Sequence, residues 1–164
     1  MENISFRILE EKDIPAILEI YSYYIAETTA TCQISPIDEE MMRKTVMPES
    51  PRYQSYAIMS DDQLCGYALF TRFKTREAFD NTAEITLYLK QGCTSKGIGT
   101  VALKFIENKA KMAGMHVLVS LVSSENASSI RLFERNGYIK CAEFKEVSFK
   151  FGRYFNLLCY QKMI

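Results

Sequence analysis

Hydrophobic and polar residues alternate along several short segments of the chain, and alternation of this kind predicts β-strands. It is plain in Ile4–Leu9 and again in Thr82–Leu89. Val117–Val122 is instead an apolar run, which is typical of a buried strand. The expected strands cover residues 4–9, 53–59, 64–70, 82–89, 117–122, 138–144 and 155–160. Ser60–Gln63 consists of turn-forming residues, so the second and third strands should form a hairpin.

Apolar residues at spacings of three and four indicate helices between these strands. The first begins near Asp13, with Pro15 in its first turn, where proline is tolerated. The second is expected to take Ser35 as its cap and Pro36 as its first helical residue, and to end near Val46. Two more helices cover residues 97–113 and 126–136, each followed by a glycine. The order of elements predicts one mixed α/β domain over residues 1–164.

The composition narrows the class of protein. The 164 residues are 48% hydrophobic and 24% charged, which is enough apolar material for one core. Lys+Arg and Asp+Glu number 20 each, so no basic excess favours a nucleic-acid partner. The five cysteines form no CxxC pair and there is one histidine, which predicts reduced thiols and no metal site. With no signal peptide and no apolar stretch of bilayer length in view, we expect a cytoplasmic protein without a membrane partner.

The segment Leu87–Thr100 carries the most specific chemical signal, because a strand runs through a loop with two glycines into a helix. Glycine lets backbone amides approach a ligand, and the free amides of a helix start attract an anion such as a pyrophosphate. The segment is not a P-loop, which needs Lys-Ser/Thr after its last glycine, and Gly97-Ile98-Gly99 lacks the third glycine of a dinucleotide fingerprint. Taken alone, it is equally compatible with an ordinary helix terminus.

With its neighbours, this segment resembles the GCN5-related N-acetyltransferase (GNAT) superfamily, and within it the phosphinothricin acetyltransferase-like group. Thr94–Gly99 fits the superfamily's pyrophosphate motif, Arg/Gln-x-x-Gly-x-Gly/Ala, except at the first position. Segments similar to those of the group occur in the same order along the whole chain, and they are Glu19–Tyr21, Thr28–Ala30, Cys65–Ala68, Thr82–Leu89, Asn126–Tyr138 and Lys150–Tyr154. The resemblance implies a central mixed sheet that splays between its fourth and fifth strands and is flanked by helices.

The resemblance also implies acetyl-CoA as the cofactor, filling the gap between the splayed strands. The residues implied for its pyrophosphate are Thr94, Ser95, Lys96, Gly97, Ile98, Gly99 and Thr100. Leu87, Tyr88 and Leu89 would accompany the pantetheine arm as an added strand does. Asn126 would hydrogen-bond the cofactor beside the thioester while also capping a helix, and Ser129 is assigned to the cofactor as well.

Catalysis of this kind needs a general base, because an amine attacks a thioester only when it is unprotonated. Glu84 matches the glutamate of the group's Thr-x-Glu motif and should act through a water, although the residues alone suggest a solvated glutamate. The backbone amide of Leu87 would stabilise the oxyanion. Related enzymes protonate the leaving thiolate with a tyrosine or histidine, where this chain has Phe133. Tyr138, Tyr88, another hydroxyl or water would serve instead, or the thiolate leaves unassisted.

The acceptor pocket is expected to include Tyr24, Lys74, Arg76 and Thr82 beside Glu84. Lys74 occupies the position where the group has an arginine that binds a substrate carboxylate. Lysine keeps the positive charge but cannot make the two parallel hydrogen bonds of a guanidinium. From the residues alone, a basic surface loop is an equally good interpretation of this segment.

The implied reaction transfers an acetyl group by direct attack to the amine of a small molecule, an amino acid or an analogue such as phosphinothricin, methionine sulfone or methionine sulfoximine. Two alternatives stay open. One is another amine, such as a polyamine or a protein N-terminus, and the other is a CoA-binding module that has lost catalysis. The resemblance further implies a homodimer, with Lys150 and Arg153 contacting the acceptor or the partner subunit.

Overall fold

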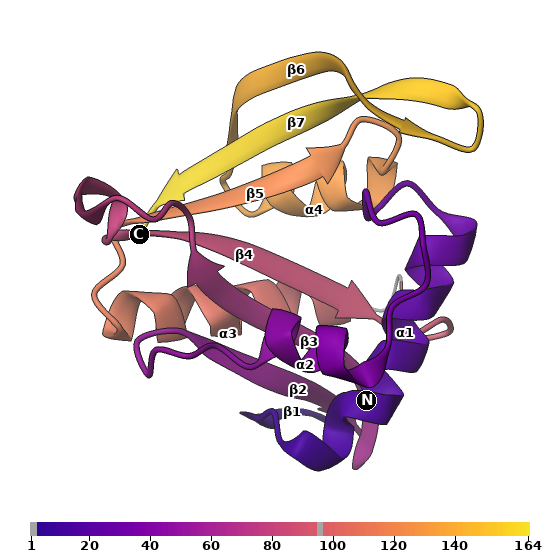
Figure 1. Ribbon diagram of the computed structural model, residues 1–164. Coiled ribbons are helices and arrows are strands. Elements are labelled where there is room, and N and C mark those ends of the chain that lie inside the picture. Colours follow the sequence, from indigo (N-terminus) through magenta and orange to yellow (C-terminus); the bar gives the residue numbers. More distant parts are fainter. Residues whose placement is uncertain (1–2, 95–96) are drawn as a thin grey trace.

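The computed structural model describes residues 3–94 and 97–164 and places seven strands in one sheet (Figure 1). The strands are β1 (Ile4–Ile8), β2 (Gln54–Ser60), β3 (Gln63–Arg72), β4 (Thr82–Leu89), β5 (Val117–Ser123), β6 (Ile139–Lys150) and β7 (Arg153–Met163). Their order across the sheet is β1-β2-β3-β4-β5-β7-β6. Neighbouring strands are antiparallel except β4 and β5, which run parallel. The sheet is therefore mixed, which confirms the predicted fold class.

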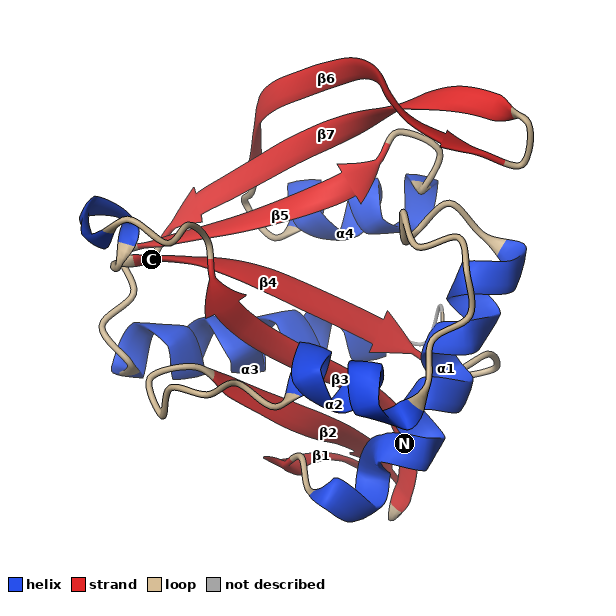
Figure 2. Cartoon of the chain, in the orientation of Figure 1, coloured by secondary structure: helices blue, strands red, loops and turns tan. Residues whose placement is uncertain are grey.

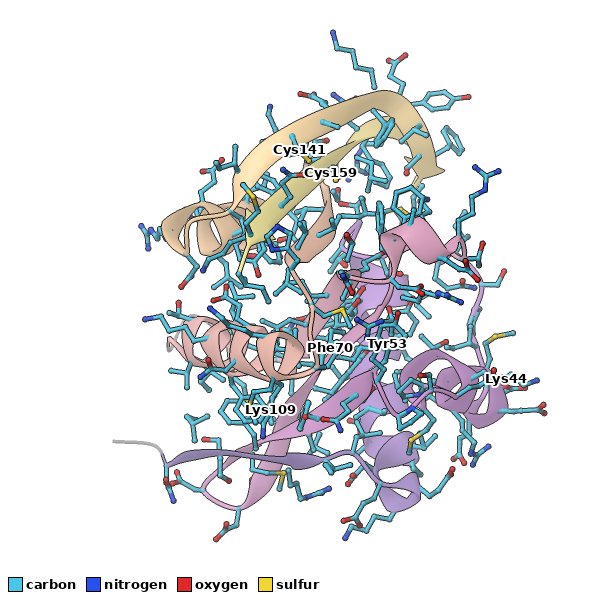
Figure 3. The ribbon with its side chains drawn as sticks, turned by 90° about the vertical axis from the view of Figure 1, so that its left-hand side faces the viewer. Lys44, Tyr53, Phe70, Lys109, Cys141 and Cys159 are labelled. Carbon is cyan, nitrogen blue, oxygen red and sulfur yellow. The ribbon has the colours of Figure 1, made fainter. Side chains whose placement is uncertain are left out.

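Helices cover both faces of this sheet (Figure 2). They are α1 (Ile14–Glu27), α2 (Glu39–Val46), α3 (Ile98–Met112) and α4 (Ala127–Arg135), with short 3-10 turns at Glu11–Asp13 and Glu77–Phe79. Side chains of β3 alternate between the faces, so that Phe70 packs in the core beneath α3 while Tyr67 packs beneath α1 and α2. Tyr53 and Phe70 lie together in the first of these cores, with ring centroids 6.3 Å apart (Figure 3). None of the helices among the described residues is long and apolar enough to cross a membrane.

The two halves of the sheet separate between β4 and β5. These strands pair only where Thr82–Glu84 lies beside Val117–Val119. Beyond that point β4 stays paired with β3, and β5 stays paired with β7 along its whole length, so the two strands diverge (Figure 1). The splay implied by the resemblance is confirmed, and it leaves the facing edges of β4 and β5 without a strand between them.

The second helix begins later than the sequence predicts. Asp38, not Ser35, is the cap, and its Oδ1 accepts a hydrogen bond of 2.8 Å from the Met41 amide. Glu39 and Glu40 follow in the first turn, where the helix dipole favours negative charge. Ser35 belongs to the preceding loop, and its carbonyl oxygen accepts from Gln33 Nε2 at 2.9 Å. The prediction was wrong because the residue that caps this helix in the structure is an aspartate three positions after the predicted serine.

The last two strands are longer than predicted and form one hairpin closed by Phe151 and Gly152. Both turn residues have positive φ values, 52° and 74°. The pairing of β6 with β7 is irregular at two places, between Lys140 and Ala142 and again between Phe144 and Ser148. Cys141 is the extra residue of the first irregularity, and its Sγ donates to the Cys159 carbonyl oxygen at 3.3 Å (Figure 3). Each bulge shifts the alternation of side chains, which hides the strand from a reading of the sequence.

The hairpin between β2 and β3 is confirmed. Ser60 pairs with Gln63, which leaves a two-residue turn at Asp61 and Asp62. Both aspartates have positive φ values, 46° and 63°, the geometry that matches the twist of a tight hairpin.

Candidate active site

A cavity of about 600 Å³ opens where β4 and β5 separate. Its walls come from α1 and the loop that follows it, from β4, from β5 and its following loop, and from the first turns of α4. The lining residues are Tyr24, Thr28, Thr29, Ala30, Thr31, Cys32, Glu84, Ile85, Thr86, Leu87, Tyr88, Gln91, Thr94, Ser120, Leu121, Val122, Ser123, Glu125, Asn126, Ala127, Ser128, Ser129, Leu132, Phe133 and Leu157. Its size suits a small-molecule site.

The cavity brings together many residues that the sequence assigns to the site. From the set assigned to acceptor, cofactor or catalysis, the cavity wall includes Tyr24, Glu84, Leu87, Tyr88, Thr94, Asn126 and Ser129. It does not include Lys74, Arg76, Thr82, Leu89, Gly97, Ile98, Gly99 or Thr100. Ser95 and Lys96 lie outside the described residues. The segments predicted around Glu84 and Asn126 therefore face one space, although more than 35 residues separate them in the sequence.

Glu84 lies on β4 at the last position that pairs with β5. It is half-buried, and its carboxylate makes no hydrogen bond or ion pair with the described part of the chain. Burial raises the pKa of this carboxyl above its usual range, and the charge of Lys74 opposes that rise. The site thus holds an unpartnered carboxylate beside an open cavity, which is an arrangement suited to taking up a proton.

The backbone of β4 presents polar groups to the same space. Lys90 N donates to the Cys65 carbonyl oxygen at 2.7 Å, so Lys90 and every second residue before it direct their backbone groups towards β3. By the same alternation, Leu87 and Leu89 direct theirs towards the gap. The Tyr24 hydroxyl donates to the Leu89 carbonyl oxygen at 2.6 Å. That carbonyl is already occupied in this structure, while the Leu87 groups remain open at the cavity wall.

Within residues 3–94 and 97–164, no side chain caps the N-terminus of α3. Gly97 precedes it with a φ of 81°, a left-handed conformation that strongly favours glycine. The Thr100 amide bonds to the Gly97 carbonyl oxygen at 3.1 Å, whereas the amides of Ile98 and Gly99 make no bond within the described residues. Free amides at the start of a 15-residue helix are suited to an anion. This observation supports a fit for the pyrophosphate of CoA.

Asn126 begins α4 as its cap. Its Oδ1 accepts from the Ser129 amide at 3.1 Å and from Ser128 Oγ at 2.9 Å. The side-chain nitrogen has no partner in the described part of the chain and stands at the cavity wall. Capping through oxygen therefore leaves the nitrogen free to donate to a ligand.

The loop Thr28–Cys32 forms one side of the cavity, although no sequence motif assigns it to the site. Lys150, whose residue is only 4% exposed, holds it from the β6–β7 hairpin. Its Nζ donates to the carbonyl oxygens of Thr28 at 2.7 Å and Thr31 at 3.1 Å. Burial lowers the pKa of this ammonium group. Carbonyl contacts of this kind leave no sequence pattern, so only the structure reveals them.

Arg153 fixes the neighbouring wall. Its guanidinium makes two bonds of 2.8 and 2.7 Å to the Glu125 carboxylate, and this arginine holds the pKa of Glu125 below its usual range. Glu125 in turn accepts from Thr29 Oγ1 at 3.1 Å, and Thr29 accepts from Ser123 Oγ at 3.0 Å. Lys150 and Arg153, expected to contact the acceptor or a partner subunit, thus bond to loops of their own chain.

Lys74 and Arg76 are exposed residues of the loop before β4. Lys74 Nζ lies 5.1 Å from the ring centroid of Phe73, close enough for a cation–π contact. Thr82 is half-buried at the first position of β4. The structure therefore gives the basic pair no place in the wall, and the influence of Lys74 on Glu84 is electrostatic.

Phe133 and Tyr138 pack against each other with ring centroids 5.0 Å apart. Phe133 lines the cavity, but Tyr138 does not. The Tyr138 hydroxyl is enclosed with no hydrogen-bond partner in the described part of the chain, and burial raises its pKa strongly. Tyr88 does line the cavity, and burial raises its pKa as well. Of the two phenols, only Tyr88 thus reaches the cavity wall, and its hydroxyl donates to the Ala30 carbonyl oxygen at 3.5 Å.

Comparison with known proteins accounts for this arrangement. Residues 6–158 match the model of the acetyltransferase (GNAT) domain. The L-methionine sulfoximine/L-methionine sulfone acetyltransferase of Pseudomonas aeruginosa is 32% identical, over 88% of this chain and 86% of its own. The phosphinothricin N-acetyltransferase of Streptomyces coelicolor is 25% identical, over 93% of this chain and 91% of its own.

Solved structures agree with the family match. The yncA protein of Salmonella typhimurium, described as an acetyltransferase with its cofactor acetyl-CoA, superposes with a TM-score of 0.86 and 27% identity over 98% of this chain and 93% of its own. The ribosomal-protein-alanine N-acetyltransferase of Brucella melitensis superposes with a TM-score of 0.91 and 29% identity over 98% of this chain and 99% of its own. The splayed sheet, the uncapped helix and the matched relatives lead to one conclusion: the chain belongs to the GNAT family and is an acetyl-CoA-dependent N-acetyltransferase.

Proposed function

We propose that this enzyme acetylates the amine of an amino acid or a close analogue, of the phosphinothricin, methionine sulfone or methionine sulfoximine type. The observation that carries the proposal is the half-buried carboxylate of Glu84 at the cavity wall, which has no partner among the residues that the structure describes. The relatives named for such substrates support the substrate class. Acetyl-CoA supplies the activated acetyl thioester, and the residues described below position and accept protons.

Each residue has a role that follows from its position. Glu84 takes the proton of the attacking amine through a water. Its raised pKa lies closer to neutral pH, which makes this carboxylate a better base than an ordinary glutamate. The Leu87 amide, directed into the gap, stabilises the negative charge that develops on the acyl oxygen. The amides of Ile98 and Gly99 bind the pyrophosphate, and the free nitrogen of Asn126 contacts the cofactor near its thioester.

The test is release of thiol from acetyl-CoA, measured with a panel of amines. Methionine sulfone, methionine sulfoximine and phosphinothricin should support turnover, while spermidine should not. If none of the amino-acid analogues is acetylated, the proposed substrate class is rejected. Binding of CoA without turnover on any amine would instead indicate a module that has lost catalysis.

A protein N-terminus is the second candidate acceptor. Two observations favour it: the similarity to a ribosomal-protein-alanine N-acetyltransferase, and the exposed position of Lys74 outside the cavity wall. A peptide beginning with alanine distinguishes the candidates, because kcat/KM for that peptide should then exceed kcat/KM for methionine sulfone.

The assembly is proposed to be a single-domain homodimer in the cytoplasm. Large apolar side chains are exposed along the β6–β7 hairpin, among them Phe144 at 51%, Phe149 at 52% and Tyr154 at 64%. Phe149 and Tyr154 pack together, with ring centroids 4.8 Å apart, and an exposed apolar patch is typical of an interface with another protein. Sedimentation velocity should give the mass of a dimer, and a monomer at micromolar concentration would reject this assembly. Cell fractionation tests the location.

A further inference from the structure

Ser120 occupies the point where β4 and β5 begin to separate. It follows Val119, the last residue of β5 that pairs with β4. Leu118 and Val122, two positions before and after it, belong to the core beneath α3, so strand alternation places Ser120 on that same face. Phe133 of α4 belongs to the same core and also lines the cavity. Ser120 therefore lies on the same side of the gap as Phe133 of α4, whose ring has no proton to donate.

Ser120 is a buried residue at the cavity wall. The residue is only 4% exposed and lines the cavity. Its hydroxyl makes no hydrogen bond within residues 3–94 and 97–164. The fully enclosed polar side-chain atoms that lack a partner in this part of the chain are Glu107 Oε1 and Tyr138 Oη. Because Ser120 Oγ is not one of them, the oxygen is open to the cavity. A hydroxyl that faces the cavity and makes no bond within the described residues is available to a ligand atom in the gap.

We propose that Ser120 is a catalytic residue, whose hydroxyl donates a hydrogen bond to the sulfur of the departing thiolate. This inference rests on the proposed acetyl transfer. The C–N bond forms as the C–S bond breaks, the electron pair of that bond goes to sulfur, and the amine proton passes through water to Glu84. Ser120 keeps its own proton, and solvent protonates the thiolate after release. The step needs no tyrosine at position 133 because a thiol with a pKa of about 8.5 is a fair leaving group once its charge is hydrogen-bonded.

The first test is Ser120→Ala in steady-state kinetics with acetyl-CoA and an accepted amine. A hydrogen bond to a charged atom that forms only in the transition state should cost roughly tenfold or more in kcat, with little change in KM. Thermal stability should change little, because the hydroxyl makes no hydrogen bond within the described residues that the substitution would break. The matched control is Ser5→Ala on the exposed edge strand β1, which should leave kcat unchanged. A kcat for Ser120→Ala equal to that of Ser5→Ala overturns the proposal.

The second test measures the bound thiol without turnover. The thiolate of CoA absorbs in the ultraviolet, so titration of the saturated complex gives the pKa of the bound thiol. A donor at the sulfur lowers this pKa, and Ser120→Ala should raise it by about one pH unit. Equal values in the wild type and the variant overturn the proposal while leaving acetyl transfer intact. Failure of the wild-type protein to bind CoA at all would reject the proposed function itself.

Discussion

Replacing Glu84 by glutamine removes the proposed base while leaving the shape of the side chain almost unchanged. The carboxylate has no hydrogen bond or ion pair in the described part of the chain, so the substitution breaks no contact. Burial raises its pKa, and Lys74 only partly opposes this effect. The folded state therefore binds a proton at Glu84 more tightly than the unfolded chain does. The stability that this proton contributes is complete below the pKa of the unfolded chain, and it is lost as the pH rises through the raised pKa of the folded state. Glutamine carries no such penalty, so the melting temperature at neutral pH should stay equal or increase.

General-base catalysis contributes roughly 100- to 10,000-fold, and action through a water places Glu84 at the lower end of that range. We therefore expect Glu84→Gln to reduce kcat/KM for the accepted amine by about 100-fold or more. The assay is thiol release at saturating acetyl-CoA, with the affinity for acetyl-CoA measured separately by calorimetry and expected to stay unchanged. Glu49→Gln, at an exposed position outside the cavity wall, is the matched control and should retain full activity.

The pH profile makes the test specific to the carboxyl group. In the wild-type enzyme, kcat/KM should fall on the acid side as Glu84 becomes protonated, with a midpoint above the ordinary range of a glutamate. The variant should lack this acid limb. A variant that retains activity to within about threefold, with the same acid limb as the wild type, would refute the assignment of Glu84 as base.

Two further predictions concern the walls of the cavity. A Cβ at Gly66 would stand 2.5 Å from the Tyr88 carbonyl oxygen. Gly66→Ala should therefore lower the free energy of unfolding, measured in urea, by about 1–3 kcal/mol. An unchanged free energy of unfolding would contradict this packing. Lys150→Met would leave the carbonyl oxygens of Thr28 and Thr31 without their donor, at a cost of about 1–3 kcal/mol. It should also raise KM for the acceptor while the dissociation constant of acetyl-CoA stays constant, and a loss confined to acetyl-CoA affinity would speak against this role of the lysine.

The local pattern of the chain was sufficient for most elements, because strands and helices are specified by residues close in sequence. The limits of β4 were predicted without error, and Gly97 was placed correctly at the start of the third helix. At the second helix, the prediction placed the cap at Ser35, three residues before Asp38, which caps the helix in the structure. Where bulges interrupted the alternation in β6, the sequence showed only half of the strand.

The resemblance pointed to the splayed sheet, to Glu84 and to Asn126, because these belong to motifs contained within single segments. The resemblance did not predict contacts between segments that lie far apart in the sequence. The hold of Lys150 on the loop at Thr28 and Thr31 joins residues more than 110 positions apart through backbone carbonyls, which every residue possesses.

By itself, then, the sequence determined the order of the elements and the uncapped glycine turn before α3, because both follow from propensity and spacing within a few residues. Only the tertiary structure decided which side chains share the cavity. Ser120 looks in the sequence like one polar residue within an apolar strand, and its proposed role depends on lying where two strands part, on the same side of the gap as Phe133. Such a neighbourhood arises from long-range packing, for which a single sequence carries no local signal.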